Sequence, residues 1–286
     1  MFYIRNIIVG ALSFGTGKSH CKTRSCHGQN ISRAVPKSAE DALRLEVDDV
    51  ERAVDKVEGW LTKNEGRLLY KLAKKCSTRG AIVEIGSWKG KSTIWIAKGS
   101  KAGKHAGVYA VDPHTGSSEH KKMFGTVATF QEFQRNIKET QVDDIVAPIV
   151  KTSKDAAADF VEPIEFIFID GAHEYEFVKE DFDLWFPKVV TGGVVAFHDI
   201  GWPGPKRVFR KELCRSRCFK RVGFVDSVGY GVKTPSNSLA DRVRNFGILC
   251  LSFSFEVKQR VRIPEPFKRW LRPVLRIATS TISKIV

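Results

Sequence analysis

Residues 81–93, AIVEIGSWKGKST, constrain the fold of this chain more than any other stretch. Ala81–Ile85 is a short apolar run, Gly86 and Gly90 follow it, and a helical pattern begins at Ser92. A strand, a glycine turn and a helix in this order form the opening unit of a Rossmann-like α/β sheet. Glycine suits the turn because the chain reverses sharply and its backbone must approach a ligand closely, which a Cβ would block.

Glu84 helps to decide which ligand such a turn can hold. The dinucleotide fingerprint is G-x-G-x-x-G, whereas this turn has only G-x-x-x-G. A nicotinamide cofactor would place its pyrophosphate here, and a pyrophosphate favours bare amides and disfavours a neighbouring carboxylate. A cationic ligand without phosphate favours the acid. S-adenosylmethionine (SAM), which carries a sulfonium, an ammonium and a ribose, fits this description.

Further apolar runs predict the rest of the sheet. Strands are expected over 107–111, 145–150, 164–169 and 194–197, followed by an antiparallel pair over 219–225 and 228–232. Ionisable residues follow three of these strands: Asp112 after the first, Asp170 after the third, and His198 with Asp199 after the fourth. Asp112 stands where a carboxylate can accept hydrogen bonds from both hydroxyls of a ribose.

The rest of the sequence predicts two N-terminal helices and a division of the chain into four parts. A charged helix over Glu40–Val57 is followed by a second helix, which begins with a capping box of Thr62 and Glu65. Trp60, between them, is expected to pack in the core, and Phe177 to face inward from a helix over 175–186. A loop is expected over 99–106. The segments are a poorly ordered basic stretch (1–38), N-terminal helices (39–79), a cofactor-binding domain (80–234) and a basic amphipathic extension (235–286).

The order of these motifs resembles that of the class I SAM-dependent methyltransferases, over roughly Gly59 to Thr234. It is most similar to the bacterial branch that acts on sugars and other small hydroxylated molecules, with Glu-Ile-Gly-Ser at the first turn and His-Asp after a later strand. The resemblance implies a Rossmann-like, seven-stranded, mostly parallel sheet with helices on both faces. It also implies that SAM contacts Glu84, Gly86, Ser87, Gly90, Ser92, Asp112, Ser153 and Asp170.

Four ionisable residues are expected to meet beyond the ends of two neighbouring strands, where ligands bind in an open parallel sheet. They are Asp170, His173, His198 and Asp199. Two carboxylates with imidazoles can hold a divalent cation or supply a general base. Either would assist O-methylation, because the acceptor hydroxyl must lose its proton. The residues alone leave this choice open.

The resemblance adds roles to these residues. In related sugar methyltransferases a magnesium-type ion bridges vicinal substrate hydroxyls, which implies Mg²⁺ or another divalent cation on Asp170, Asp199 and His198. The expected catalytic residues are His173, His198 and Asp199, with His173 the first choice of base and His198 the second.

The net charge of +15 is concentrated in the C-terminal third. Residues 80–200 hold 13 Lys/Arg and 18 Asp/Glu, whereas residues 201–286 hold 19 and 5. This excess indicates either an acidic partner or a solvated basic face, and the sequence favours neither. Residues 264–286 carry apolar side chains at helical spacing among basic ones, a pattern that suits peripheral contact with an anionic membrane or docking on a second subunit. Nucleic acid is disfavoured because no groove-reading motif occurs. Phe246–Phe255 fits a strand or a buried helix.

The sequence therefore predicts a SAM-dependent methyltransferase that O-methylates a sugar, a glycan or another hydroxylated small molecule. The alternatives are a hydroxylase-type relative of the same scaffold and a non-catalytic membrane- or nucleic-acid-binding module. A pure binding module has no reason to keep a cofactor pocket with Glu84 and Asp112. Six cysteines without a C-x-x-C pair predict reduced thiols in a cytoplasmic protein, free or at the inner membrane face. The oligomeric state, a homo-oligomer included, stays open.

Overall fold

A computed structural model describes residues 38–117 and 125–260. The helices are α1 (Ala39–Val54), α2 (Lys63–Lys74), α3 (Lys91–Ala102), α5 (Phe130–Glu139), α6 (Ser153–Asp159), α7 (Tyr175–Trp185), α8 (Pro203–Val208) and α9 (Leu239–Arg260), and a π-helical turn, η2 (Phe209–Cys214), continues α8. The strands are β1 (Ala81–Ile85), β2 (Val108–Val111), β3 (Val146–Ile149), β4 (Ile164–Ile169), β5 (Val189–Phe197), β6 (Phe219–Val225) and β7 (Val228–Lys233).

The seven strands form one sheet in the order β3-β2-β1-β4-β5-β7-β6. β1 to β5 are parallel, while β7 runs antiparallel to both β5 and β6. The predicted Rossmann-like, mostly parallel sheet is confirmed, including the closing antiparallel pair. The strand order reverses between β1 and β4, and ligands bind beyond the carboxyl ends of the strands at such a point.

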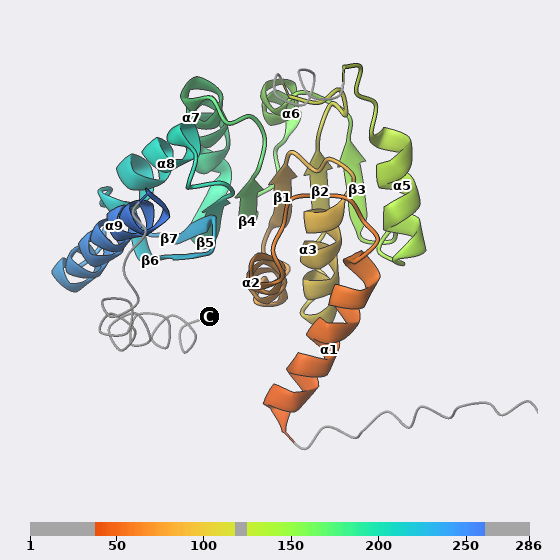
Figure 1. Cartoon of the computed structure of the whole chain (residues 1–286), viewed down its shortest axis with the longest axis horizontal. Coiled ribbons are helices and arrows are strands. Elements are labelled where there is room, and N and C mark those ends of the chain that lie inside the picture. Colours follow the sequence, from red (N-terminus) through yellow and green to blue (C-terminus); the bar gives the residue numbers. More distant parts are fainter. Residues whose placement is uncertain (1–37, 118–124, 261–286) are drawn as a thin grey trace, which may run out of the picture.

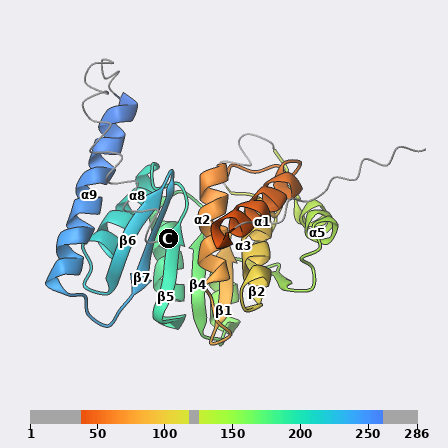
Figure 2. The ribbon, with the colours of Figure 1, turned by 90° about the horizontal axis from the view of Figure 1, so that it is seen from below.

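Helices cover both faces of the sheet (Figures 1 and 2). Along β1, Ile82 packs into one core with α1, α2 and α3, whereas Val83 and Ile85 pack into a second core with α6 and α7. This alternation arises because successive strand residues point to opposite faces. Both faces of β1 and β4 are buried, which explains why these strands read as continuous apolar runs.

Helices α1 and α2 are fixed by apolar packing and by a capping box. Val47, Val50 and Val54 bury one face of α1. Thr62 caps α2: its hydroxyl accepts from the Glu65 amide at 3.2 Å, and the Glu65 carboxylate accepts from the Thr62 amide at 2.8 Å. The predicted capping box is therefore confirmed.

Three local predictions were wrong. The expected loop over 99–106 begins later, because α3 continues to Ala102; a Cβ on Gly99 would lie 2.3 Å from the Tyr70 carbonyl oxygen, so this glycine allows α3 to approach α2 closely. β5 starts at Val189 instead of Val194, since Val189 pairs with Ile164 before the irregularity at Gly192. Phe177 is 54% exposed on α7 and does not face inward.

The stretch 246–255 is helical, as part of α9, so the strand alternative is wrong. The expectations for residues 1–37, and for the amphipathic tail over 264–286, lie outside the described residues. Three of the cysteines that the structure describes, Cys76, Cys214 and Cys218, are free thiols, as expected for them. Within the described ranges, no helix combines the length and the apolar character needed to cross a bilayer.

Candidate active site

The turn after β1 approaches the end of β4. Gly86 has φ of +85° and Gly90 φ of +91°, in the left-handed region that glycine adopts readily. A Cβ on Gly86 would lie 2.2 Å from the carbonyl oxygen of Asp170, so alanine would clash with backbone there. The predicted requirement for glycine at this turn is confirmed at Gly86.

Asp112, at the end of β2, holds the glycine turn in place. One carboxylate oxygen accepts from the amides of Ser87 and Trp88, at 2.9 and 2.8 Å, and the other accepts from the amide of His114 at 2.6 Å. A carboxylate offers about four lone-pair positions, so these three bonds leave capacity for a ligand hydroxyl. The residue expected at the ribose thus also fixes the backbone of the turn.

Glu84 is fully buried in β1 beneath this turn. Thr93 donates its hydroxyl hydrogen to one carboxylate oxygen, while the other oxygen, Oε1, has no hydrogen-bond partner among the described residues. Burial raises the pKa of Glu84 to about 8, against the opposing effect of hydrogen bonds from Ser92 and Thr93. A buried acid with an unpartnered oxygen suits a cationic ligand, which would favour the ionised form.

The three serines expected at the cofactor lie in different settings. Ser87 is buried in the turn, and its Oγ has no hydrogen-bond partner in the described part of the chain. Ser92 is buried in α3 and hydrogen-bonds Glu84. The Ser153 hydroxyl, at the start of α6, accepts from the indole nitrogen of Trp185 at 2.9 Å and is therefore already engaged with α7.

The four ionisable residues beyond β4 and β5 do converge. Nε2 of His173 lies 3.1 Å from Oδ2 of Asp199. Nδ1 of His198 lies 3.1 Å from Oδ2 of Asp199 and 3.1 Å from Oδ1 of Asp170. Asp199 therefore contacts both imidazoles.

The two histidines differ in their surroundings. His198 is buried, whereas the His173 side chain is 20% exposed and its ring stacks on Trp202 with centroids 4.9 Å apart. Burial alone would lower the pKa of His198, but the carboxylates of Asp170, Asp199 and Glu65 outweigh burial and raise it well above its usual range. A protonated imidazole can donate hydrogen bonds but can neither accept a proton nor bind a metal.

One group of donor atoms could hold a divalent cation. Single ligand atoms of Asp170, His173 and Asp199 all lie within 4.8 Å of one another. Two carboxylates and one imidazole are donors that Mg²⁺, Mn²⁺ and Zn²⁺ accept, so the donor set fits such an ion. In this group His173 takes the place that the sequence assigned to His198.

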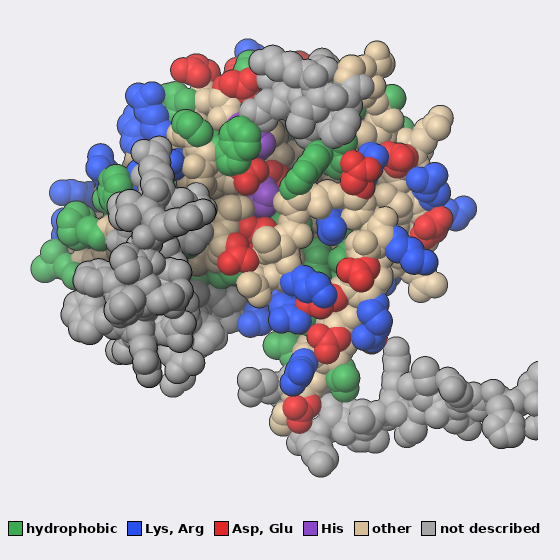
Figure 3. Space-filling view, in the orientation of Figure 1, with side chains coloured by type: hydrophobic (Ala, Val, Ile, Leu, Met, Phe, Trp, Pro, Cys, Tyr) green, Lys and Arg blue, Asp and Glu red, His purple; other side chains and the backbone are tan. Residues whose placement is uncertain are grey.

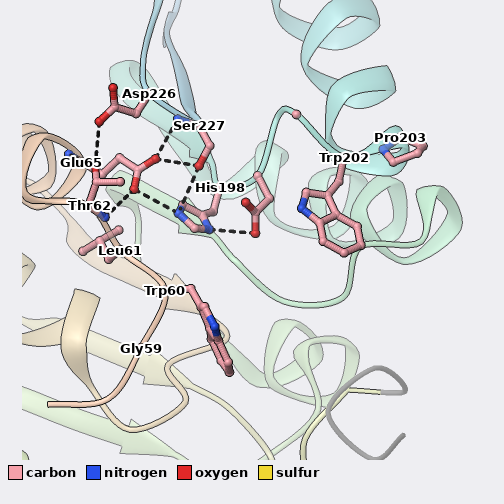
Figure 4. A pocket seen from close by; sticks show the side chains of 12 residues that line it. Gly59, Trp60, Leu61, Thr62, Glu65, His198, Trp202, Pro203, Asp226 and Ser227 are labelled. Carbon is pink, nitrogen blue, oxygen red and sulfur yellow. Dashed lines mark hydrogen bonds and ion pairs between the residues drawn. The ribbon is translucent and has the colours of Figure 1, made fainter. Parts of the chain in front are cut away.

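Glu65 joins the N-terminal helices to this cluster. Its Oε1 accepts from the amide and hydroxyl of Ser227, at 2.7 and 2.6 Å, and its Oε2 lies 3.5 Å from Nε2 of His198. Figure 4 shows Glu65, His198 and Ser227 pointing toward one another. Burial would raise the pKa of Glu65, yet bonds from His198, Ser227 and Thr62 lower it to about 2.

A cavity of about 720 Å³ opens next to His198 and Asp199. Its walls come from the α1–α2 connection, the loop after β5 and the β6–β7 turn, and the lining residues are Gly59, Trp60, Leu61, Thr62, Glu65, His198, Asp199, Gly201, Trp202, Pro203, Asp226 and Ser227. Trp60 and Trp202 border the opening, and Figure 3 shows histidine beside acidic and apolar side chains on this face.

Sequence reasoning missed part of this cavity. Trp60 is 55% exposed, so its expected place in the core is wrong; it packs against Trp88 beside the cavity. Trp202 and Ser227 were not singled out, and Glu65 was read only as a helix cap. Spacing along the chain could not reveal that Glu65 meets a hairpin 162 residues away.

Comparisons with known proteins match part of this chain. The family description "Methyltransferase domain" matches residues 83–200. An uncharacterized protein, y4gI of Sinorhizobium fredii, is 31% identical over 120 residues, which cover 41% of this chain and 13% of that protein. Uncharacterized protein R132 of Acanthamoeba polyphaga mimivirus is 28% identical over 120 residues, 41% of this chain and 50% of that protein. The chain thus matches at most half the length of these relatives.

Among solved structures, that of the O-methyltransferase NovP is similar in fold. It is 17% identical with a TM-score of 0.53, and the match covers 69% of this chain and all of NovP. The family match includes the glycine turn, Asp112 and the residues beyond β4 and β5. Residues 83–200 therefore match a methyltransferase domain, and the fold is similar to that of an O-methyltransferase.

Proposed function

We propose that this chain transfers the methyl group of SAM to a hydroxyl of a sugar, a glycan or another polyhydroxylated small molecule. The observation that supports this most is the convergence of Asp170, His173, His198 and Asp199 beyond β4 and β5. These groups lie beside the point where the strand order reverses, and two of them, His198 and Asp199, line the cavity. A group that can accept a proton would thereby lie between the residues proposed to bind SAM and the cavity proposed to bind the hydroxyl that is methylated.

The cofactor half would hold SAM through groups that favour positive charge and hydroxyls. Glu84 would face the ammonium, Asp112 would accept from the ribose, and Gly86 and Gly90 would leave room for close contact. Ser87, Ser92, Ser153 and Asp170 complete the proposed cofactor set. When bound, SAM supplies an electrophilic methyl group, and the protein aligns the in-line attack.

On the acceptor side, His173 would take the hydroxyl proton as the oxygen–methyl bond forms and the sulfur–methyl bond breaks. Asp199 orients His173 at 3.1 Å and would stabilise the imidazolium that results. His198 is less suited to this task, because three carboxylates keep it protonated. It would instead hold Asp170 and Asp199 in position.

A divalent cation, if bound, would use Asp170, His173 and Asp199 and would stabilise negative charge on the acceptor oxygen. His173 would then act as a ligand and not as the base. The Mg²⁺ dependence of the reaction therefore distinguishes the two arrangements.

The cavity favours an acceptor without phosphate or carboxylate groups. Among the described residues, its lining includes Glu65, Asp199 and Asp226 but no lysine or arginine, although the whole chain has a net charge of +15. Like charges would repel an anionic acceptor. Trp60 and Trp202 instead offer flat apolar faces, on which the C–H face of a sugar ring can pack.

Calorimetric titration with SAM, with and without Mg²⁺, tests this function. We expect the wild type to bind SAM and Asp112→Ala to bind it at least about tenfold more weakly, because the variant loses the ribose acceptor and leaves three amides unsatisfied. Asp112→Asn, which keeps one acceptor oxygen, should fall between them. A folded wild type that does not bind SAM would contradict the proposal and leave a non-catalytic binding module in its place.

The raised pKa of Glu84 predicts a pH signature. Its folded pKa of about 8 lies above its ordinary value of 4.5, so the folded state holds a proton that the unfolded state loses between these values. Glu84 should therefore lower the stability of the SAM-free protein as the pH rises from about 4.5 to about 8, and Glu84→Gln should remove this contribution, while Asp181 and His198, whose pKa values are also raised, keep theirs. If SAM favours the ionised form of Glu84, binding of SAM at pH 7 should release up to about one proton from the protein.

Calorimetry in two buffers of different ionisation enthalpy measures that proton release. Glu84→Gln should bind SAM more weakly and release no proton. Equal proton release by the wild type and this variant would show that Glu84 does not face the ammonium.

A further inference from the structure

The outer face of α9 is an apolar surface that the described fold leaves uncovered. The inner face of this helix is fixed against β6 and η2: Ile248 and Leu249 are buried, and Asn245, also buried, donates its side-chain amide to the Phe219 carbonyl at 2.9 Å. These contacts determine which side of α9 points outward.

The outward side carries a stripe of apolar residues, here called the α9 stripe: Leu239, Val243, Phe246, Cys250 and Phe253. Leu239 is 69% exposed, Val243 66%, Phe246 62% and Phe253 44%, and Cys250 is also exposed. Their spacing of four, three, four and three residues places them on one face of a helix. An apolar stripe normally faces the core, but here the core lies on the other side. Such exposed apolar patches mark interaction surfaces.

Basic residues are frequent in the part of the chain that contains the α9 stripe, and two of them lie beside it. The segment 203–253 contains eleven Lys/Arg and three Asp/Glu. Arg242 is exposed on α9 itself, and the guanidinium of Arg210, from η2, lies 3.8 Å from the centre of the Phe253 ring. Figure 3 shows apolar side chains beside Lys and Arg at the edge of the molecule where α9 lies.

The basic residues beside the α9 stripe form its rim, and their charge favours one kind of partner over another. A second copy that placed its stripe on this one would bring two basic rims together. Asp241, an acid of α9 whose side chain the structure describes, already accepts hydrogen bonds from Ser238 at the start of the helix. A surface that offers both apolar and anionic groups complements the stripe and its rim together.

We propose that the α9 stripe docks on an anionic lipid surface, with Leu239, Val243, Phe246 and Phe253 entering the headgroup region. Arg242, exposed on α9, is placed to pair with lipid phosphates and carboxylates at the same level. The helix lies on the bilayer and does not cross it, because its inner face is packed against β6. This docking does not depend on the proposed methyltransferase activity.

Co-sedimentation of the full chain with vesicles tests this docking. Wild type should bind vesicles of phosphatidylcholine with added phosphatidylserine, and bind phosphatidylcholine alone weakly. A double variant, Val243→Glu with Phe246→Glu, should lower binding by about tenfold or more, because it places two acids in the apolar stripe. Val161→Glu is the matched control: Val161 is 90% exposed outside this surface, so its replacement should leave vesicle binding unchanged.

Other results would overturn the proposal. Equal sedimentation of the wild type and the double variant would show that the stripe does not face lipid, as would equal binding to both kinds of vesicle. A wild-type dimer in light scattering that the double variant converts to a monomer, without any vesicle binding, would assign the stripe to a second copy of the chain.

Discussion

Replacing Gly86 with alanine is expected to abolish SAM binding and to lower the free energy of unfolding by about 2–5 kcal/mol. Two effects add. The φ of +85° costs a residue with a Cβ about 1–2 kcal/mol. The new Cβ would also lie 2.2 Å from the Asp170 carbonyl oxygen, and overpacking of this kind costs about 1–3 kcal/mol. The clash is with backbone, so it can be relieved only by moving the ends of β1 and β4 apart.

Gly192→Ala is a control that separates the cost of the positive φ from the cost of the steric clash. Gly192 has nearly the same φ, +88°, but a Cβ there would have nothing within 4 Å. This control should lose only the strain contribution of about 1–2 kcal/mol and should keep its SAM affinity. Urea unfolding and SAM calorimetry measure both quantities. Equal losses for the two variants would mean that the contact between the turn and β4 does not constrain the site.

Features that follow from local sequence patterns could be predicted for this fold. The strand β1, its glycine turn and the acids at the strand ends follow local patterns, so Glu84, Gly86 and Asp112 could be placed from sequence alone. The meeting of Asp170 with Asp199 could also be predicted, because parallel neighbours end at the same edge of a sheet.

What the sequence could not predict depends on partners far apart in the chain. Glu65 forms the capping box that its spacing indicates, yet its buried carboxylate also binds Ser227, which no local pattern links to it. The sequence predicts that Trp60 packs in the core next to the helix expected over the first strand, but Trp60 borders the cavity. The α9 segment was ambiguous because it is apolar on both faces, so its periodicity was weak.

Asp199→Asn is expected to lower the rate of methyl transfer by about 10³-fold, while SAM affinity stays close to that of the wild type. Asp199 is the one residue described here that lies within 3.1 Å of both His173 and His198. An asparagine removes the charge that would stabilise a protonated His173, and loss of a general base of this kind costs about 10²–10⁴-fold in rate. It also removes a proposed cation ligand, so both arrangements of the site predict the loss.

Asp226→Asn is the matched control, because Asp226 lines the same cavity and contacts neither histidine in the described structure. Its carboxylate accepts from Thr62 and Asn64, at 2.8 and 3.2 Å, so the variant should change acceptor binding more than the methyl-transfer step. The assay measures S-adenosylhomocysteine formed with a panel of neutral sugars, at saturating SAM, with Mg²⁺ or with a chelator. A rate loss in Asp199→Asn that is no larger than in Asp226→Asn would remove Asp199 from the catalytic machinery. A 10³-fold loss that persists with the chelator would assign Asp199 to the support of His173 as a base, since no cation would then remain for it to hold.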